Sequence, residues 1–468
     1  MKMNKFFAAF VAATMLLTSC SKEEAGNGTI TQGEETFAGI SISIPSPLAS
    51  RAEAGAEAGN AATAAESLIS NVGVFVVDAA AGTIDKLYLS TGSDFTFNGL
   101  TGVATANKAI RTTTGLKTVY VVTNYDGVKA QIDALGAAAF TNNALALGEN
   151  SFKTESAGTL VNMTMTGSVV ETISVQSEAD ALATPIEIDI YRNLAKVIVR
   201  HAAATTPVTG GKHQASTLEF GMISKANGAW LSNTPTTTAS SATASAYTGI
   251  PTAALSNDAH AYWNNFSAHV LGTTAGVYKA VNAFNSGATA YQTYGGWYCH
   301  ENIYAASGAG LELYAGNTTS ARIRGKFIPN EIVTAIAADG TRTVFNNTST
   351  STASSFYRLV DGSYWTEGAY TTATGATPGN PDYIAASSFS SKYDGGMGYY
   401  RIIVMDEDRV PGVKRNNYYD LAIEAIEGPG SPTEEPDDVI DPLDEESYIA
   451  VKVTVKPWWK QSTGHVIQ

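Results

Sequence analysis

The chain has 468 residues, of which 44% are hydrophobic and only 15% are charged, and its formal net charge is −14. This length exceeds one ordinary hydrophobic core and predicts two domains. A surface this acidic argues against nucleic acid and anionic lipid head groups as partners. Apolar runs are short and bounded by Gly, Asn and Asp, which is typical of secreted β-sandwich proteins. We therefore expect an all-β protein.

The first twenty residues have the pattern of an export signal. Two lysines precede an apolar stretch, residues 6–17, that is too short for a stable membrane anchor. Residues 17–20, LTSC, resemble a bacterial lipobox, in which the cysteine thiol takes a lipid. We expect residues 1–19 to be a signal peptide and Cys20 to carry diacylglycerol and palmitate. The alternative is an ordinary signal whose cysteine is incidental.

Residues 20–51 are interpreted as a lipidated propeptide that contains a removable strand. Alternation in the stretch FAGISISI, residues 37–44, predicts a strand with one buried face. Two prolines follow and end the strand, because proline lacks the N–H that a ladder needs. The predicted buried face carries Ile40, Ile42 and Ile44.

A single arginine follows this strand. Arg51 is the only basic residue between Lys22 and Lys86, so an Arg-specific protease would find one target there, the bond from Arg51 to Ala52. The alternative is an arginine that only makes a linker more soluble, since exposed arginines are common.

The rest of the chain divides by composition. Residues 52–66 are rich in alanine with two glycines and predict a flexible linker. Strand-like segments then predict an N-terminal sandwich over 67–185 and a C-terminal sandwich over 186–427. Residues 428–446 combine prolines and acids with no basic residue, which predicts a solvated spacer.

Alternation returns in the C-terminal segment, residues 447–468. A strand there would carry its apolar side chains on one face, namely Ile449, Val451, Val453, Val455 and Trp459. Two interpretations are open. The strand completes its own sandwich, as terminal strands usually do, or the spacer carries it to another molecule, where it repairs a sheet that lacks a strand.

The sequence resembles the major fimbrial subunits of Bacteroidales, the type V pilins. The matching segments are residues 17–24, the isoleucine strand with Arg51, and residues 119–124, 191–197, 298–302, 415–419 and 451–459. The resemblance implies two tandem transthyretin-like β-sandwich domains with detachable N-terminal and C-terminal strands. It also implies a lipidated outer-membrane precursor whose lipid and first strand are removed by a surface Arg-specific protease. Strand exchange with the next subunit then builds the extracellular pilus shaft.

The partners that this resemblance implies are other copies of the chain in a head-to-tail polymer, fimbrial anchor and tip subunits, and the processing protease. Receptors on host or bacterial surfaces are further candidates, and the expected role is adhesion. Two alternatives stay open: a tip or accessory fimbrial subunit, and a monomeric surface lipoprotein that binds glycan or protein.

Motifs for catalysis are weak. The chain has no HExxH motif and no P-loop. Cys299, His300 and Glu301 are adjacent, but neighbouring residues on a strand point to opposite faces, so we expect a buried thiol rather than a metal site. The acidic run 406–408 leaves a calcium site open. We expect no enzyme activity and no cofactor.

Overall fold

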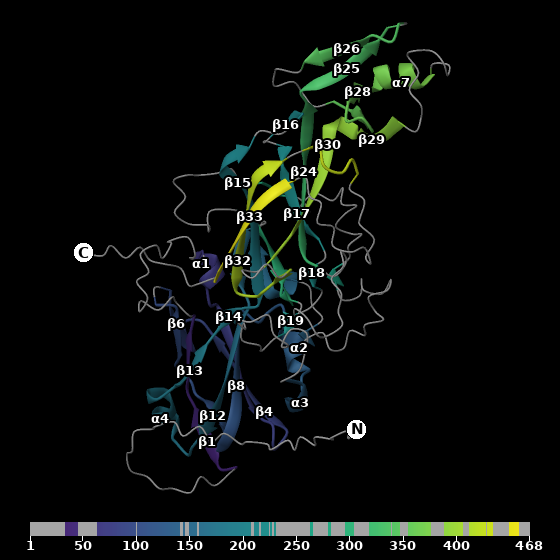
Figure 1. The fold of residues 1–468 in the computed structure, drawn as a ribbon. Helices are drawn as coiled ribbons and strands as arrows, with labels where there is room; N and C mark the ends of the chain where they lie inside the picture. The colour runs from purple at the N-terminus through teal and green to yellow at the C-terminus, as the bar shows by residue number, and fades with distance from the viewer. Residues whose placement is uncertain are drawn as a thin grey trace, which may run out of the picture.

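The computed structural model shows an all-β protein with a few short helices (Figure 1). The structure describes residues 33–44, 63–99, 101–140, 144–145, 149–156, 159–206, 210–214, 217–223, 225–226, 229–230, 263–264, 279–281, 295–303, 318–337, 339–346, 354–375, 388–405, 411–426, 428–433 and 449–457. The all-β fold class expected from the sequence is confirmed.

The first body consists of two packed sheets. One sheet has the order β14-β12-β8-β3-β4 and the other has the order β13-β2-β6-β5, while β1 pairs with β7 beside them. The strands are β1 (Glu35–Ala38), β2 (Ile40–Ser43), β3 (Asn71–Asp78), β4 (Thr83–Ser90), β5 (Phe95–Asn98), β6 (Val103–Ala106), β7 (Ile110–Thr113), β8 (Gly115–Thr123), β12 (Met165–Ile173), β13 (Ile186–Asp189) and β14 (Tyr191–Arg192).

The main core of this body lies between the two sheets. Alternate residues of β3 and β8 point into it, including Val72, Val74 and Val121. The outer face of the same sheet is covered by α2 (Lys129–Asp133), α3 (Ala137–Phe140) and the 3-10 turn η2 (Glu149–Phe152), which pack against Phe75 and Tyr120. Because both of their faces are covered, β3 and β8 consist largely of apolar residues.

The second body is also a pair of sheets, with the orders β22-β15-β32-β33 and β16-β24-β17-β21, and β30 pairs with β24. Its core contains Val197, Phe220, Ile323 and Leu421. The strands are β15 (Leu194–Thr206), β16 (Gly211–His213), β17 (Glu219–Ile223), β21 (Lys279–Ala280), β22 (Gly296–His300), β24 (Ser320–Pro329), β30 (Met397–Ile403), β32 (Asn417–Ile426) and β33 (Ile449–Pro457).

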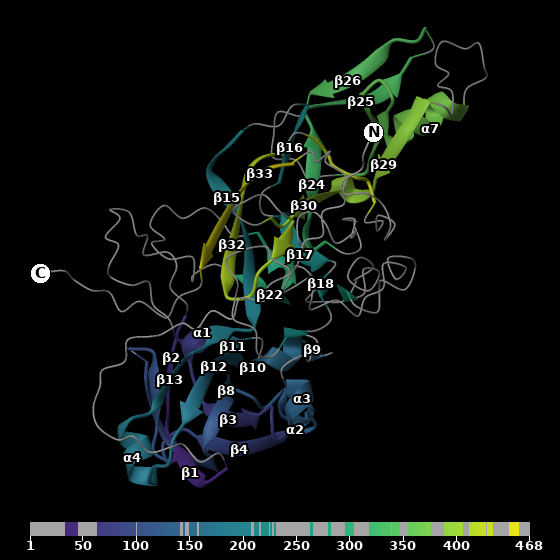
Figure 2. The same cartoon turned by 60° about the horizontal axis from the view of Figure 1, so that its bottom comes forward.

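A third sheet lies at the far end of the second body from the first body, as Figures 1 and 2 both show. Its order is β26-β25-β28-β27-β29, and the helix α7 (Glu367–Gly375) packs on it around the buried Trp365. The strands are β25 (Glu331–Ile336), β26 (Arg342–Asn346), β27 (Phe356–Leu359), β28 (Tyr364–Thr366) and β29 (Phe389–Tyr393), followed by the turn η8 (Asp394–Gly396). The sequence analysis predicted no separate sheet within residues 186–427, because these strands are only three to six residues long.

Short elements complete the described structure. They are α1 (Ala64–Ser67), α4 (Glu178–Ala183), β10 (Lys153–Ser156) with β11 (Thr159–Met163), β9 (Ala144–Leu145) with β19 (Ala229–Trp230), β18 (Lys225–Ala226) with β20 (Trp263–Asn264), and β23 (Asn302–Ile303) with β31 (Gly412–Val413).

Three boundaries differ from those predicted. Residues 186–192 pair with strands of the first body, so that body continues past residue 185. Residues 63–66 are not linker, because they carry the Thr63–Glu66 capping box of α1. Residues 428–430 are buried rather than solvated, and Ser431 bridges to Tyr399. Residues 63–66 and 428–430 are polar or small in composition, and contacts with residues distant in sequence order them.

Candidate functional site

The strand β2 occupies an internal position in its sheet. It runs parallel to β13, with Ile40 opposite Ile186 and Ile42 opposite Ile188, and antiparallel to β6, with Ile42 opposite Ala104. The N–H of Ile44 continues this pairing by donating to the carbonyl of Gly102 at 3.0 Å. A strand predicted to be removable is therefore hydrogen-bonded on both of its edges.

The three isoleucines of the N-terminal strand point into the core of the first body. Ile40, Ile42 and Ile44 are only 2–3% exposed and pack with residues of β3, β8 and β13. Fully burying an aliphatic side chain contributes about 1.5–3 kcal/mol, so the three together contribute roughly 5–9 kcal/mol as an upper estimate. The three side chains therefore lie between the two sheets of the first body.

A glycine lets the chain pass from β1 to β2 beside α4. A Cβ atom on Gly39 would lie 2.0 Å from the backbone carbonyl oxygen of Ala181, so no larger residue fits there without a shift of the backbone. On the β1 side, the Thr36 hydroxyl donates to the carbonyl of Ser174 at 2.8 Å, and Arg111 forms an ion pair with Glu35. Residues 33–44, the described part of the predicted propeptide, are thus held by specific contacts along their whole length.

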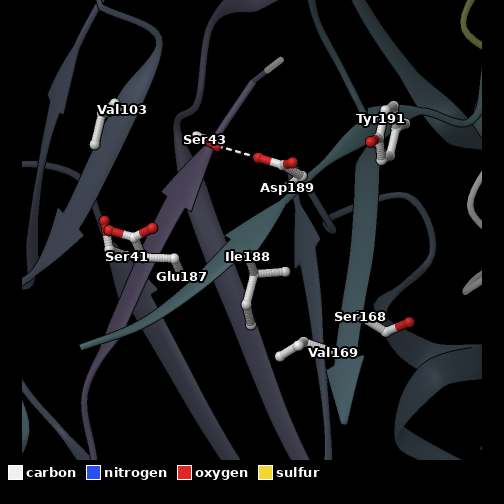
Figure 3. A pocket seen from close by; sticks show the side chains of 9 residues that line it. All are labelled: Ser41, Ser43, Val103, Ser168, Val169, Glu187, Ile188, Asp189 and Tyr191. Atoms are coloured by element: carbon white, nitrogen blue, oxygen red, sulfur yellow. Dashed lines mark hydrogen bonds between the residues drawn. The ribbon is translucent and has the colours of Figure 1, made fainter. Parts of the chain in front are cut away.

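The outer face of β2 is polar and borders a cleft of about 580 Å³. Figure 3 shows Ser41 and Ser43 on this face beside Glu187 and Asp189 of β13. The Ser43 hydroxyl donates a hydrogen bond to Asp189, and both carboxyl-bearing residues are exposed. Burial, and in second place the Asp189 carboxylate, raises the pKa of the nearby Tyr191 hydroxyl.

The C-terminal strand β33 lies at the edge of its own sheet. It pairs antiparallel with β32 from Ile426 opposite Ile449 to Asn417 opposite Pro457, with one register shift between Ile423 and Ala425. Of the two interpretations left open by the sequence, this molecule shows the first, in which the strand completes its parent sheet. The predicted lipidation and cleavage residues Cys20, Arg51 and Ala52, and also Trp459, lie outside the described residues.

A buried polar cluster joins the two bodies directly after the predicted propeptide and linker. Glu66 in α1 is 1% exposed, and its Oε1 accepts hydrogen bonds from Lys196 Nζ at 2.9 Å and from the Tyr298 hydroxyl at 2.8 Å. Its Oε2 accepts from the backbone N–H of Thr63 at 2.7 Å. Burial alone would raise the pKa of Glu66, but the charge of Lys196 and these hydrogen bonds lower it overall.

Arg192 extends the same cluster. Its side chain is fully buried and donates from Nε to the carbonyl of Glu66 at 2.8 Å and from Nη2 to the Ser67 hydroxyl at 3.0 Å. Its backbone N–H donates to Asn416 Oδ1 at 3.2 Å, which reaches into the second body. Burial lowers the pKa of Arg192 to about 10. Sequence reasoning missed this cluster, although the T-x-x-E pattern of the capping box was a visible signal.

Of the remaining sequence candidates, the structure describes residues 299–301. Cys299 and His300 are both fully buried, in agreement with the expected buried thiol. Within the part of the chain that the structure describes, no group of three or more His, Cys, Asp or Glu side chains is placed to hold a metal ion. The acidic run 406–408 lies outside the described residues. No helix among those described is both long and apolar enough to cross a membrane.

Comparison with known proteins finds a family match near the C-terminal end of the chain. Residues 391–463, from within β29 past the end of β33, match the family model described as "Major fimbrial subunit protein type IV, Fimbrillin, C-terminal". This part of the chain is therefore similar to the C-terminal part of fimbrial subunits. More particularly, it is fimbrillin-like, which confirms the resemblance to major fimbrial subunits that the sequence indicated. A search of curated protein sequences finds no match.

Three solved structures are similar over most of the chain. A fimbrilin from Porphyromonas gingivalis W83 is 15% identical with a TM-score of 0.45, covering 92% of this chain and 99% of the other. The tip fimbrial protein of Porphyromonas gingivalis with a C-terminal truncation is 11% identical with a TM-score of 0.38, covering 91% and 100%. A fimbrial assembly protein from Parabacteroides distasonis ATCC 8503 is 11% identical with a TM-score of 0.31, covering 81% and 100%.

Proposed function

We propose that this chain is a structural subunit of a cell-surface fimbria, and that it polymerises by strand exchange after a cut between Arg51 and Ala52. The observation that carries the proposal is the position of β2 between β6 and β13. A strand that is central in its sheet yet joined to the rest of the chain by a single segment leaves behind a defined vacancy when it departs. The same strand carries the predicted lipid anchor at its N-terminal side.

The vacancy left by β2 would be unfavourable to keep open. Departure exposes the facing edges of β6 and β13 and the apolar surface that Ile40, Ile42 and Ile44 cover. Unpaired backbone groups beside an apolar groove form a template for an added strand. The first body is therefore suited to receive a strand from a second molecule.

The strand β33 is suited to be the donor. In its own sheet it is paired with β32 alone among the described strands, whereas in the vacancy it would be paired on two sides. Its sequence alternates Ile449, Val451, Val453 and Val455 with polar or small residues, which matches the period of the isoleucines in β2. A strand that exchanges one paired edge for two gains backbone hydrogen bonds and buried apolar area.

Repeating this contact builds a fibre. Donor and acceptor surfaces differ, so the contact is head-to-tail and does not close on itself. The remaining parts of the proposal follow: a lipoprotein precursor anchored through Cys20 at the outer membrane, an Arg-specific surface protease, and a mature extracellular subunit. Fimbrial anchor and tip subunits are the further partners, and adhesion through surface receptors is the role of the finished fibre.

The cleavage is tested with purified precursor and an Arg-specific protease. The wild type should lose residues 20–51, expose Ala52 as a new N-terminus and form filaments visible by electron microscopy. Arg51→Ala and Arg51→Lys should stay monomeric with unchanged intact mass. Placing the recognition sequence of an unrelated protease around position 51 of Arg51→Ala should restore filaments only with that protease. Filaments formed by Arg51→Ala would refute the cleavage step.

The monomeric surface lipoprotein is the second candidate, and the pairing of β33 with β32 is the observation that favours it. A chain whose C-terminal strand already completes its own sheet needs no partner to fold. In that case protease treatment of the wild type would produce cut or uncut monomers and no filaments. Deleting residues 447–468 adds a second test, because a donor strand is required for polymers and not for the fold of the first body.

A further inference from the structure

We propose that Glu187 and Asp189 recognise Lys452 of the incoming subunit, and so favour the C-terminal strand over the propeptide strand in the groove. This inference rests on the proposed strand exchange and names the residues that select the donor. It concerns the outer face of the groove. Burial of the isoleucines on the inner face does not explain how one strand would be selected over another.

The two carboxylates face the residues that the donor would replace. In the parallel pair of β2 and β13, Ser41 is opposite Glu187 and Ser43 is opposite Asp189. Paired residues of neighbouring strands project on the same side of a sheet, here the side away from the core. Figure 3 shows these four side chains together at the cleft.

The cleft leaves room for a longer side chain at either serine. Its volume is about 580 Å³, and its lining includes the apolar side chain of Val103 and the two carboxylates. Among the described residues that line it, none is Lys or Arg. A lysine placed there can lay its apolar stem along Val103, which is opposite Ser43 on β6, and bring its ammonium group to a carboxylate.

The donor sequence places a lysine at this face in every matching register. The stretch IAVKVTVKP begins at Ile449, and a strand that fills the three isoleucine positions with Ile or Val can run in either direction in two registers. In the direction of β2, either Val451 or Ile449 takes the place of Ile40, and Lys452 then replaces Ser41 or Ser43 respectively. In the opposite direction, Val453 or Val455 takes the place of Ile40, and Lys452 again replaces Ser41 or Ser43.

The result does not depend on the polarity of the inserted strand. In all four arrangements Lys452 takes the position of Ser41 or Ser43 and so faces Glu187 or Asp189. The propeptide strand offers only serine hydroxyls to the same carboxylates. Strand exchange would therefore replace a neutral serine with the positively charged Lys452 beside these carboxylates. A solvent-exposed ion pair favours the donor by about twofold to fivefold at low salt.

The test measures polymer growth after protease treatment of purified full-length precursor. Initial rates are followed by light scattering and by detergent-resistant ladders on gels. Lys452→Glu and the double variant Glu187→Lys/Asp189→Lys should each slow growth about tenfold at about 50 mM NaCl, because like charges then face each other. Combining all three substitutions should restore the rate to within about threefold of the wild type.

The charge effect is separated from general effects by two controls. Glu331→Lys/Asp339→Lys makes the same change in net charge at exposed positions in and beside the third sheet, away from β2, and should polymerise within about twofold of the wild type. At about 1 M NaCl the differences among all variants should shrink, because the Debye length falls to roughly 3 Å. Thermal unfolding of each uncut precursor checks that the variant is folded.

The outcomes separate the two proposals. If the wild type polymerises and Lys452→Glu grows at the wild-type rate at low salt, the carboxylates do not select the donor and only this inference fails. The same holds if the combined variant is no faster than Lys452→Glu alone. If the cleaved wild type forms no polymer, strand exchange itself fails and this inference with it.

Discussion

The two terminal strands of this chain occupy opposite kinds of position. The strand β2 is internal, paired with β6 and β13, and its isoleucines are buried in the core of the first body. The strand β33 is an edge, paired with β32. An internal strand is held by two ladders and, on leaving, disrupts a core, whereas an edge strand is held by one ladder and leaves its sheet otherwise paired. In the proposed strand exchange, this asymmetry suits the β2 site to be the acceptor and β33 to be the donor.

The largest effect should come from removing each strand in turn. A precursor without residues 20–44 loses roughly 5–9 kcal/mol of isoleucine burial from the first body, which is comparable to the whole stability of a domain. A precursor without residues 447–468 loses one edge and should keep both bodies folded. Differential scanning calorimetry of the two truncated proteins checks this order.

The contrast between β2 and β33 would be contradicted if deleting residues 447–468 lowered stability more than deleting residues 20–44. A first body that melts at the wild-type temperature without residues 20–44 would show that β2 contributes little. A second body that fails to fold without residues 447–468 would show that β33 is a structural strand, not a donor held in reserve.

Single substitutions sharpen the same comparison within β2. Ile42→Ala leaves a cavity in the core and should lower the free energy of unfolding by about 2–5 kcal/mol. Ser41→Ala, one residue away on the outer face, should change it by less than about 0.5 kcal/mol. Urea unfolding of the uncut precursor measures both.

Weakening β2 should also speed exchange. After protease treatment, Ile42→Ala should polymerise faster than the wild type, because the strand that must leave is held less tightly. Equal stability of Ile42→Ala and Ser41→Ala would contradict the assignment of inner and outer faces.

The strand itself was predictable from the sequence, but its neighbours were not. The alternation of Ile40, Ile42 and Ile44 identified both the strand and its buried face, because side-chain direction is a local property with period two. The parallel partner β13 lies about 146 residues further along the chain, and no local pattern specifies such a pairing. The carboxylates that border the groove belong to that partner and were missed for the same reason.

The buried polar cluster around Glu66, between the two bodies, also could not be predicted from local sequence. Residues 52–66 have the composition of a linker, yet Glu66 is buried because Lys196 and Tyr298 are brought to it by the second body. The third sheet was missed because its strands are short and separated by polar stretches. Local composition predicted segments that interact with their sequence neighbours and failed where distant contacts decide the structure.

The smallest expected effect is the contribution of the Glu66 charge to stability. Glu66 lies in α1, which would stay with the rest of the chain after β2 leaves. The helix α1 is the first described element after the proposed cut, and its Glu66 fixes that part of the chain to Lys196 of the second body. The folded-state pKa of Glu66 lies below its ordinary value of 4.5. Protons therefore bind the unfolded chain more readily, so this contribution is fully present above pH 4.5 and is lost as the pH falls through the folded-state pKa.

We therefore expect the stability of the wild type to fall below pH 4.5 more steeply than that of Glu66→Gln, which cannot ionise at this position. Glu171→Gln, an exposed carboxylate, serves as the control and should follow the wild type. The difference between wild type and Glu66→Gln from pH 7 to pH 3, measured by urea unfolding, isolates this group from the other carboxylates. This pH-dependent difference in the free energy of unfolding reports only the difference between two protonation states of Glu66. It should therefore be smaller than the loss of unfolding free energy caused by Ile42→Ala. Parallel pH curves for wild type and Glu66→Gln would show that the junction does not depend on the Glu66 charge, and that another contact keeps the mature chain in place when the propeptide strand departs.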